Sequence, residues 1–285
     1  MLFFEGDIEV LLKHCPYNRL VQGRVCGAGF WWLALLEGWA LTRKRLLIIF
    51  LSAALGAALW FSWYLPENHG FWFNIDKSVF FFFNDLLPVS RVFLVLDALL
   101  NERVFDAVSF LAMALLFYWY WRKYGAAERA RLFCMGVLML LCAVAIKQIS
   151  LAFCPVTRAS PTIFFDKVNL ITELLDWDIA PKVKSSSSFP GDHGMMLMIF
   201  CCFMGRYFGR GAFLKAAALA FLFAMPRVMG GAHWFTDIAI GSLSVVLIVM
   251  PAILLTPFSD RAIDFLMRFV PRRFYEKPTA QEIAP

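Results

Sequence analysis

Six apolar runs separated by polar stretches dominate the pattern of hydrophobic and polar positions along this chain. A membrane-spanning helix needs about 20 mostly apolar residues, so a chain of 285 residues has room for about six such helices with modest loops. The pattern therefore predicts an all-α fold, a six-transmembrane-helix bundle. The runs cover residues 46–65, 105–121, 132–153, 195–208, 216–225 and 234–255.

Two further apolar segments do not have the pattern of a spanning helix. Residues 75–100 are interrupted by acidic residues, a lysine and a proline, so we expect helices that lie along the outer surface. Residues 30–41 are too short to span, contain Glu37 and carry several tryptophans, a composition that suits an interfacial helix. This pattern predicts an N-terminal extension, a six-span membrane domain, and a basic tail. Their boundaries are 1–45, 46–257 and 258–285.

The distribution of lysine and arginine predicts the orientation of the bundle. Cytoplasmic loops of membrane proteins carry an excess of these residues, and here they gather between alternate apolar runs. The basic segments are 43–45, 122–131, 206–215 and 261–273. This pattern places both termini in the cytoplasm and the long loop 155–192 on the outer face.

Composition supports a membrane protein and argues against other classes. Hydrophobic residues make up 61% of the chain, and 31 of them are phenylalanine. The net charge of +6 is explained by the basic inner loops, and no basic stripe interleaved with aromatic residues indicates nucleic-acid binding. The seven cysteines form no CxxC pair and lie mostly within apolar runs, so we expect free thiols rather than a disulfide framework or a zinc cluster.

The first candidate for chemistry lies where one apolar run ends and the next begins. Arg227, His233 and Asp237 occur there, and ionisable residues at the edge of a membrane-spanning segment are functional candidates because they are costly to place there. His233 and Asp237 share a helix face if the chain is helical. A carboxylate can then hold one imidazole nitrogen and leave the other free as a nucleophile. The planar, permanently charged fork of Arg227 suits phosphate oxygens.

Two more stretches add to this pattern. Gly191, Asp192 and His193 precede the run that begins at residue 195, and the start of a helix offers unpaired N–H groups to an anion. A histidine there can give a proton to a departing phosphate oxygen. Lys147 comes directly after the apolar stretch 132–146, within the run 132–153, and Arg158 follows that run; both supply further cations.

Together these stretches resemble the signatures of the membrane type-2 phosphatidic acid phosphatase superfamily, usually written K-x6-RP, PSGH and SR-x5-H-x3-D. The chain departs from each of them. Ten residues separate Lys147 from Arg158, PSGH becomes PGDH, and Pro226 replaces the serine before the last arginine. The lost serines remove hydroxyl donors to phosphate. The stretches 158–162, 188–196, 226–238 and 254–261 are similar to the branch of the superfamily that modifies lipid A in Gram-negative inner membranes.

The resemblance implies a phosphotransferase with its active site on the periplasmic side of the inner membrane. It implies undecaprenyl diphosphate as donor and lipid A or lipopolysaccharide as acceptor. We expect no metal or other cofactor, because arginines rather than clustered carboxylates accompany the histidines. His233 is then the nucleophile that forms a phosphohistidine, Asp237 its orienting partner, and His193 the general acid. The predicted phosphate-binding residues are Arg158, Arg227, Lys147, Gly191 and Asp192.

Three alternatives remain open at this point. A lipid phosphate phosphatase would use the same residues with water as acceptor. A lipid transporter would carry polar residues near the middle of several spans, whereas here the ionisable residues lie at span ends on one side. A metal site built from His193, His233 and Asp237 is chemically reasonable, but two neighbouring arginines would repel the cation.

Overall fold

The fold was analysed in a computed structural model, in which residues 42–175 and 181–271 are described. The predicted interfacial helix at 30–41 lies outside the described residues. So do most of the N-terminal extension and the end of the basic tail.

The described chain is helical, which confirms the all-α class. Among the described residues, five segments are long and apolar enough to cross a membrane. They are α4 (Arg43–Tyr64), α7 (Arg103–Trp121), α8 (Ala126–Phe153), α12 (Arg210–Met229), and the π-helix η2 (Asp237–Ser242) continued by α13 (Leu243–Leu255). The remaining predicted run, 195–208, forms α11 (Asp192–Phe208), which has 17 residues and is about 25 Å long at 1.5 Å per residue.

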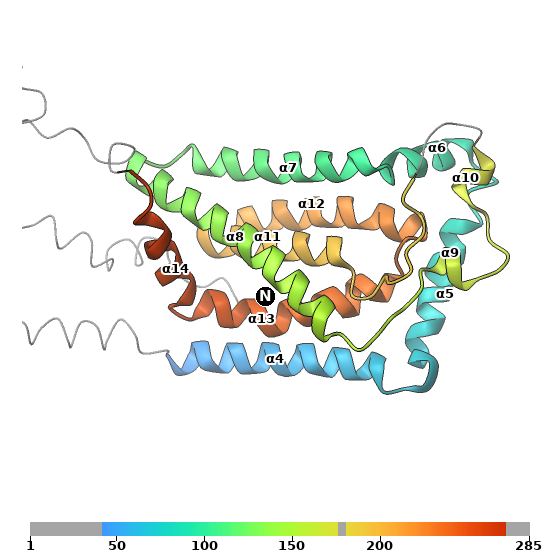
Figure 1. Cartoon of the computed structure of the whole chain (residues 1–285), viewed down its shortest axis with the longest axis horizontal. Coiled ribbons are helices and arrows are strands. Elements are labelled where there is room, and N and C mark those ends of the chain that lie inside the picture. Colours follow the sequence, from blue (N-terminus) through green and yellow to red (C-terminus); the bar gives the residue numbers. More distant parts are fainter. Residues whose placement is uncertain (1–41, 176–180, 272–285) are drawn as a thin grey trace, which may run out of the picture.

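The six helices form one elongated bundle (Figure 1). Helix α11 lies inside it and contacts α7, α8, α12 and α13, while α4 packs along α13. The side chains of Ile199, Phe203 and Met204 on α11 are fully buried. By contrast, α4 and α7 expose many large apolar side chains, such as Phe50 and Phe110. Such outward apolar surface suits contact with lipid, because water would penalise it.

The turn between α11 and α12 explains their antiparallel packing. Gly209 ends α11 with φ 87° and is also the residue before α12. Other side chains rarely adopt this positive φ, so a single glycine reverses the chain. The Gly209 amide donates to the Gly205 carbonyl at 3.1 Å.

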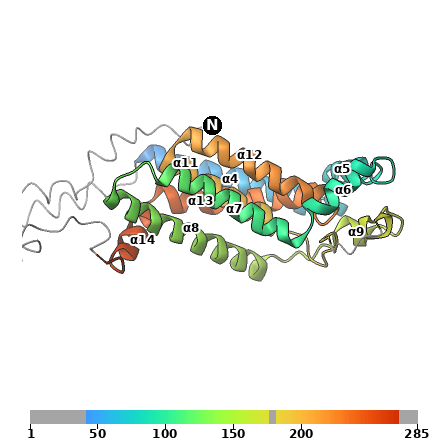
Figure 2. The same ribbon diagram turned by 90° about the horizontal axis from the view of Figure 1, so that it is seen from above.

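Short helices gather beyond one end of the bundle (Figures 1 and 2). The helices expected in residues 75–100 are present as α5 (Phe71–Asn84) and α6 (Arg91–Leu100). Hydrogen bonds between two asparagines join α5 to the loop before α10 (Ile171–Leu174). Asn84 Nδ2 donates to the Asn169 carbonyl at 2.8 Å, and the Asn169 backbone amide donates to Asn84 Oδ1 at 3.0 Å. We call the group of short helices at this end of the bundle the cap. Its helices are η1 (Glu67–His69), α5 (Phe71–Asn84), α6 (Arg91–Leu100), α9 (Pro161–Phe164) and α10 (Ile171–Leu174).

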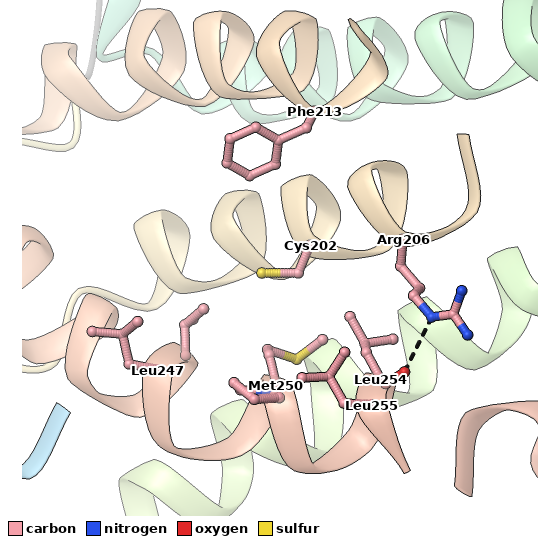
Figure 3. A pocket seen from close by; sticks show the side chains of 9 residues that line it. Cys202, Arg206, Phe213, Leu247, Met250, Leu254 and Leu255 are labelled. Carbon is pink, nitrogen blue, oxygen red and sulfur yellow. Dashed lines mark hydrogen bonds between the residues drawn. The ribbon is translucent and has the colours of Figure 1, made fainter. Parts of the chain in front are cut away.

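The opposite end of the bundle has a different character. Helix α14 (Phe258–Met267), within the predicted tail, packs on α8 and α13, and Arg131 pairs with Asp264 there. Between α11, α12 and α13 lies a mainly apolar cavity, with Arg206 at its edge donating to the Leu254 carbonyl at 3.1 Å (Figure 3). This cavity lies far along α11 from His193 and plays no part in the predicted site.

Candidate active site

The predicted site residues come from distant parts of the sequence and meet at the cap end of the bundle. Lys147 lies near the end of α8, and His193 lies in the first turn of α11. Arg227 lies in the last turn of α12, and Asp237 begins η2. Antiparallel packing of the helices brings these ends together, as the alternation of spans predicted.

His233 lies in the tight connection between α12 and η2. Its Nδ1 is 2.9 Å from the Ser188 carbonyl oxygen and 3.5 Å from Asp237 Oδ2. Because a carbonyl oxygen can only accept, the neutral ring has its proton on Nδ1 and its lone pair on Nε2. The ring is 6% exposed, so the imidazole is held in one orientation. This is the geometry of a nucleophile: the contacts at Nδ1 hold the ring, and Nε2 is the nitrogen that can react.

Asp237 is held from several sides. Its Oδ2 accepts from the Trp234 amide at 2.8 Å, and its Oδ1 accepts from Arg158 Nη1 at 3.0 Å. Its carbonyl accepts from the Gly191 amide at 2.9 Å, which ties the start of α11 to η2. A side chain at Gly191 would be crowded, since a Cβ there would lie 3.1 Å from Ile238 Cγ1. Single π-helical turns often occur at functional sites.

Arg158 lies in the loop after α8 and is 8% exposed. Its Nη1 donates to Asp237 Oδ1 and to Thr236 Oγ1, both at 3.0 Å, and its Nη2 donates to Asp76 Oδ2 at 2.8 Å. The guanidinium also lies over the Trp234 ring, 4.4 Å from the centroid. Arg158 therefore has two carboxylate partners within the protein, and phosphate binding by this residue stays a prediction.

His193 and Arg227 share one carboxylate. Asp106, in the first turn of α7, pairs with Arg227 Nη2 and lies 3.9 Å from His193 Nδ1. Arg227 Nη1 also donates to the Asn101 carbonyl at 3.3 Å. Asp106 is half exposed and Arg227 is buried, so an anion approaching Arg227 would compete with Asp106.

Lys147 and Asp192 form a partly exposed ion pair, with Nζ 2.8 Å from Oδ2. The other oxygen of Asp192 accepts from the His193 amide at 2.8 Å. The Asp192 carboxylate therefore holds Lys147 beside the first turn of α11. The amide of Gly191, which we predicted to bind phosphate, already donates to Asp237.

Sequence reasoning missed two carboxylates of this site, Asp76 and Asp106. Both interrupt apolar segments, and this is the signal that could have identified them. It also overlooked Cys154 and Pro155, which follow Lys147 at the spacing that the K-x6-RP signature requires. Cys154 thus occupies the signature's arginine position. Among the described residues, no group of three His, Cys, Asp or Glu side chains is placed to hold a metal ion.

Comparisons with known proteins find similarity over most of the chain. The model of the PAP2 superfamily matches residues 155–260, the stretch that contains Arg158, His193, Arg227 and His233. The lipid A 1-diphosphate synthase of Escherichia coli (strain K12) is 51% identical over 228 residues, covering 80% of this chain and 95% of that protein. No solved structure matches.

Proposed function

This chain belongs to the PAP2 superfamily, and from that premise we propose that it is a membrane phosphotransferase that makes lipid A 1-diphosphate. The similarity to the lipid A 1-diphosphate synthase extends over most of both chains and supports lipid A as acceptor. We propose undecaprenyl diphosphate as donor and the periplasmic face of the inner membrane as the place of reaction. The observation that carries the proposal is the orientation of His233. Its Nδ1 faces the Ser188 carbonyl oxygen, so its Nε2 is the nitrogen that can attack phosphorus.

In the first step, His233 Nε2 attacks the distal phosphorus of the donor. A phosphorus–nitrogen bond forms and the bond from that phosphorus to the bridging oxygen breaks, which releases undecaprenyl phosphate. His193 gives its proton to the departing oxygen. Arg227 and Lys147 neutralise the phosphate oxygens while charge spreads over them, as phosphoryl transfer requires.

In the second step, an oxygen of lipid A 1-phosphate attacks the same phosphorus. The phosphorus–nitrogen bond breaks, and the electron pair returns to Nε2. A phosphate monoester has a second pKa of about 6, so the acceptor presents an anionic oxygen near neutral pH. It needs little help from a base, and this favours transfer over attack by water.

The other predicted phosphate ligands have supporting roles in this scheme. Asp192 holds Lys147, and Gly191 fixes the start of α11 to Asp237. Asp237 orients His233 from 3.5 Å. Arg158 holds Asp237 through Nη1.

The proposal is tested with purified protein and donor radiolabelled in its distal phosphate, with and without lipid A, followed by separation of the products. We expect label in lipid A 1-diphosphate when lipid A is present and much slower release of inorganic phosphate without it. Release of inorganic phosphate at the same rate in both reactions would instead identify a lipid diphosphate phosphatase.

A further inference from the structure

Resting on the proposed function, we infer that Asp76 on α5 is a positioning residue for phosphoryl transfer, which acts on His233 through Arg158 and Asp237. Asp76 lies outside the three signature stretches and comes from a cap helix. It does not contact His233 by any hydrogen bond that the structure records. Its effect on the chemistry would pass through two intervening side chains.

Asp76 is a buried carboxylate, and both of its oxygens accept hydrogen bonds. It is 1% exposed, and its Oδ1 accepts from the Thr236 amide at 2.8 Å. Its Oδ2 accepts from Thr236 Oγ1 at 2.6 Å and from Arg158 Nη2 at 2.8 Å. Burying an ionised carboxylate is costly unless it is paired and hydrogen-bonded. These three bonds meet that requirement and join α5 to the residue before Asp237.

The ion pair with Asp76 determines the orientation of the Arg158 guanidinium. With Nη2 on Asp76, only Nη1 reaches Asp237, where it binds Oδ1. Asp237 Oδ2 is then left for the Trp234 amide and for His233. Without Asp76, both Nη groups of Arg158 could bind Asp237 as a bidentate pair, the geometry that guanidinium and carboxylate prefer. That pair would draw Oδ2 away from His233.

The charge of Asp76 also depends on Arg158. Burial raises the pKa of Asp76, whereas the Arg158 guanidinium and the hydrogen bonds from Thr236 lower it. If the guanidinium is removed, burial acts with less opposition and favours the protonated, neutral carboxyl group. Replacing Asp76 should therefore matter much less once Arg158 has been replaced, and this non-additivity is the signature of action through Arg158.

The test is a double-mutant cycle of Asp76→Asn and Arg158→Gln in the full chain. Single-turnover formation of phosphoenzyme from labelled undecaprenyl diphosphate is measured together with steady-state kcat and donor KM. We expect Asp76→Asn to slow phosphoenzyme formation by about 10- to 100-fold, the size of loss expected from a small misplacement of a reacting group. Donor KM should stay within about threefold, since no group that binds the donor is removed. The double variant should be nearly as active as Arg158→Gln alone.

Asn84→Ala is the matched control. Asn84 lies on the same helix and is also buried, but it holds the loop at Asn169 rather than Arg158. It should lower the melting temperature in detergent and leave the rate of phosphoenzyme formation close to that of the wild type. If it slows this step as much as Asp76→Asn does, Asp76 merely anchors the cap, and the inference is wrong.

The inference is equally overturned if Asp76→Asn has wild-type rates or if the losses of the two single variants multiply in the double variant. Should Asp76→Asn fail to fold, Thr236→Val removes the hydroxyl that binds both Asp76 and Arg158. It should give a smaller loss with the same non-additivity. If the wild type consumes donor without a trapped phosphohistidine, the covalent step of the proposed function is wrong, and the double-mutant cycle is then measured as the rate of donor turnover.

Discussion

Replacing Asp97 by asparagine should stabilise the protein, and the gain should grow as the pH rises. Asp97 lies on α6 in the cap and is fully buried. Asn101 Nδ2 donates to its Oδ1 at 2.9 Å, while its Oδ2 has no hydrogen-bond partner among the described residues. Burial raises the pKa of Asp97 from 3.8 to about 7, and the bond from Asn101 only partly opposes this.

The sign of the effect follows from linkage. The folded state binds the Asp97 proton more tightly than the unfolded state. The stabilisation from this proton is therefore complete below about pH 4, is lost as the pH rises towards 7, and stays lost above it. A pKa change from 3.8 to about 7 corresponds to about 4 kcal/mol. This figure is an upper limit, because a fold that relaxes around the charge recovers part of it.

The assay is thermal unfolding in detergent between pH 5 and pH 8. Asparagine resembles the protonated acid and does not ionise, so the advantage of Asp97→Asn should increase by about 3 kcal/mol over this range. This corresponds to roughly 5–10 °C in melting temperature. Asp85→Asn, on an exposed residue between α5 and α6, serves as control and should leave the pH dependence unchanged. A melting-temperature difference for Asp97→Asn that is constant or shrinks with rising pH would refute the reasoning.

Two other predictions concern topology and acid catalysis. A cysteine introduced at the exposed Ser186 should react with a membrane-impermeant reagent from the periplasm, and one at the exposed Ala126 should not; the reverse pattern would place the site in the cytoplasm. His193→Asn should lower the rate of phosphoenzyme formation by about 10²- to 10⁴-fold, the usual range for a general acid, with phosphoenzyme still detectable at long times by quench trapping. An unchanged rate would remove His193 from the proton transfer.

The sequence predicted the bundle well because apolar periodicity and loop charge determine which segments enter a membrane. The positions of Lys147, His193, Arg227 and His233 followed from the same pattern, since alternate span ends must meet on one side. His233 was expected to share a helix face with Asp237, but it lies in a bend before the helix; the bend still places its Nδ1 3.5 Å from Asp237 Oδ2. However, the nearest partner of His233 is the Ser188 carbonyl, and periodicity carries no information about such a contact.

The partners of the charged groups could not be read from the chain. Arg158 was predicted to bind phosphate because it is a cation that follows an apolar run and lies in a stretch that carries the family resemblance. Asp76, one of the two carboxylates it binds, lies 82 residues away, on a helix beyond the end of the bundle. Asp106 was also missed as a site residue, because it lies in the first turn of an apolar span. Such pairings depend on how the cap packs, and hydrophobic patterns do not specify that packing.

The central claim is a covalent phosphohistidine at His233, and rapid-quench trapping of label from undecaprenyl diphosphate tests it most directly. The wild type should yield acid-labile, base-stable phosphate on the protein within one turnover, and added lipid A should discharge it into lipid A 1-diphosphate. His233→Ala should trap none, because the attacking nitrogen is absent. Label that still forms on His233→Ala, but not on His193→Asn, would show that the nucleophile has been assigned to the wrong histidine.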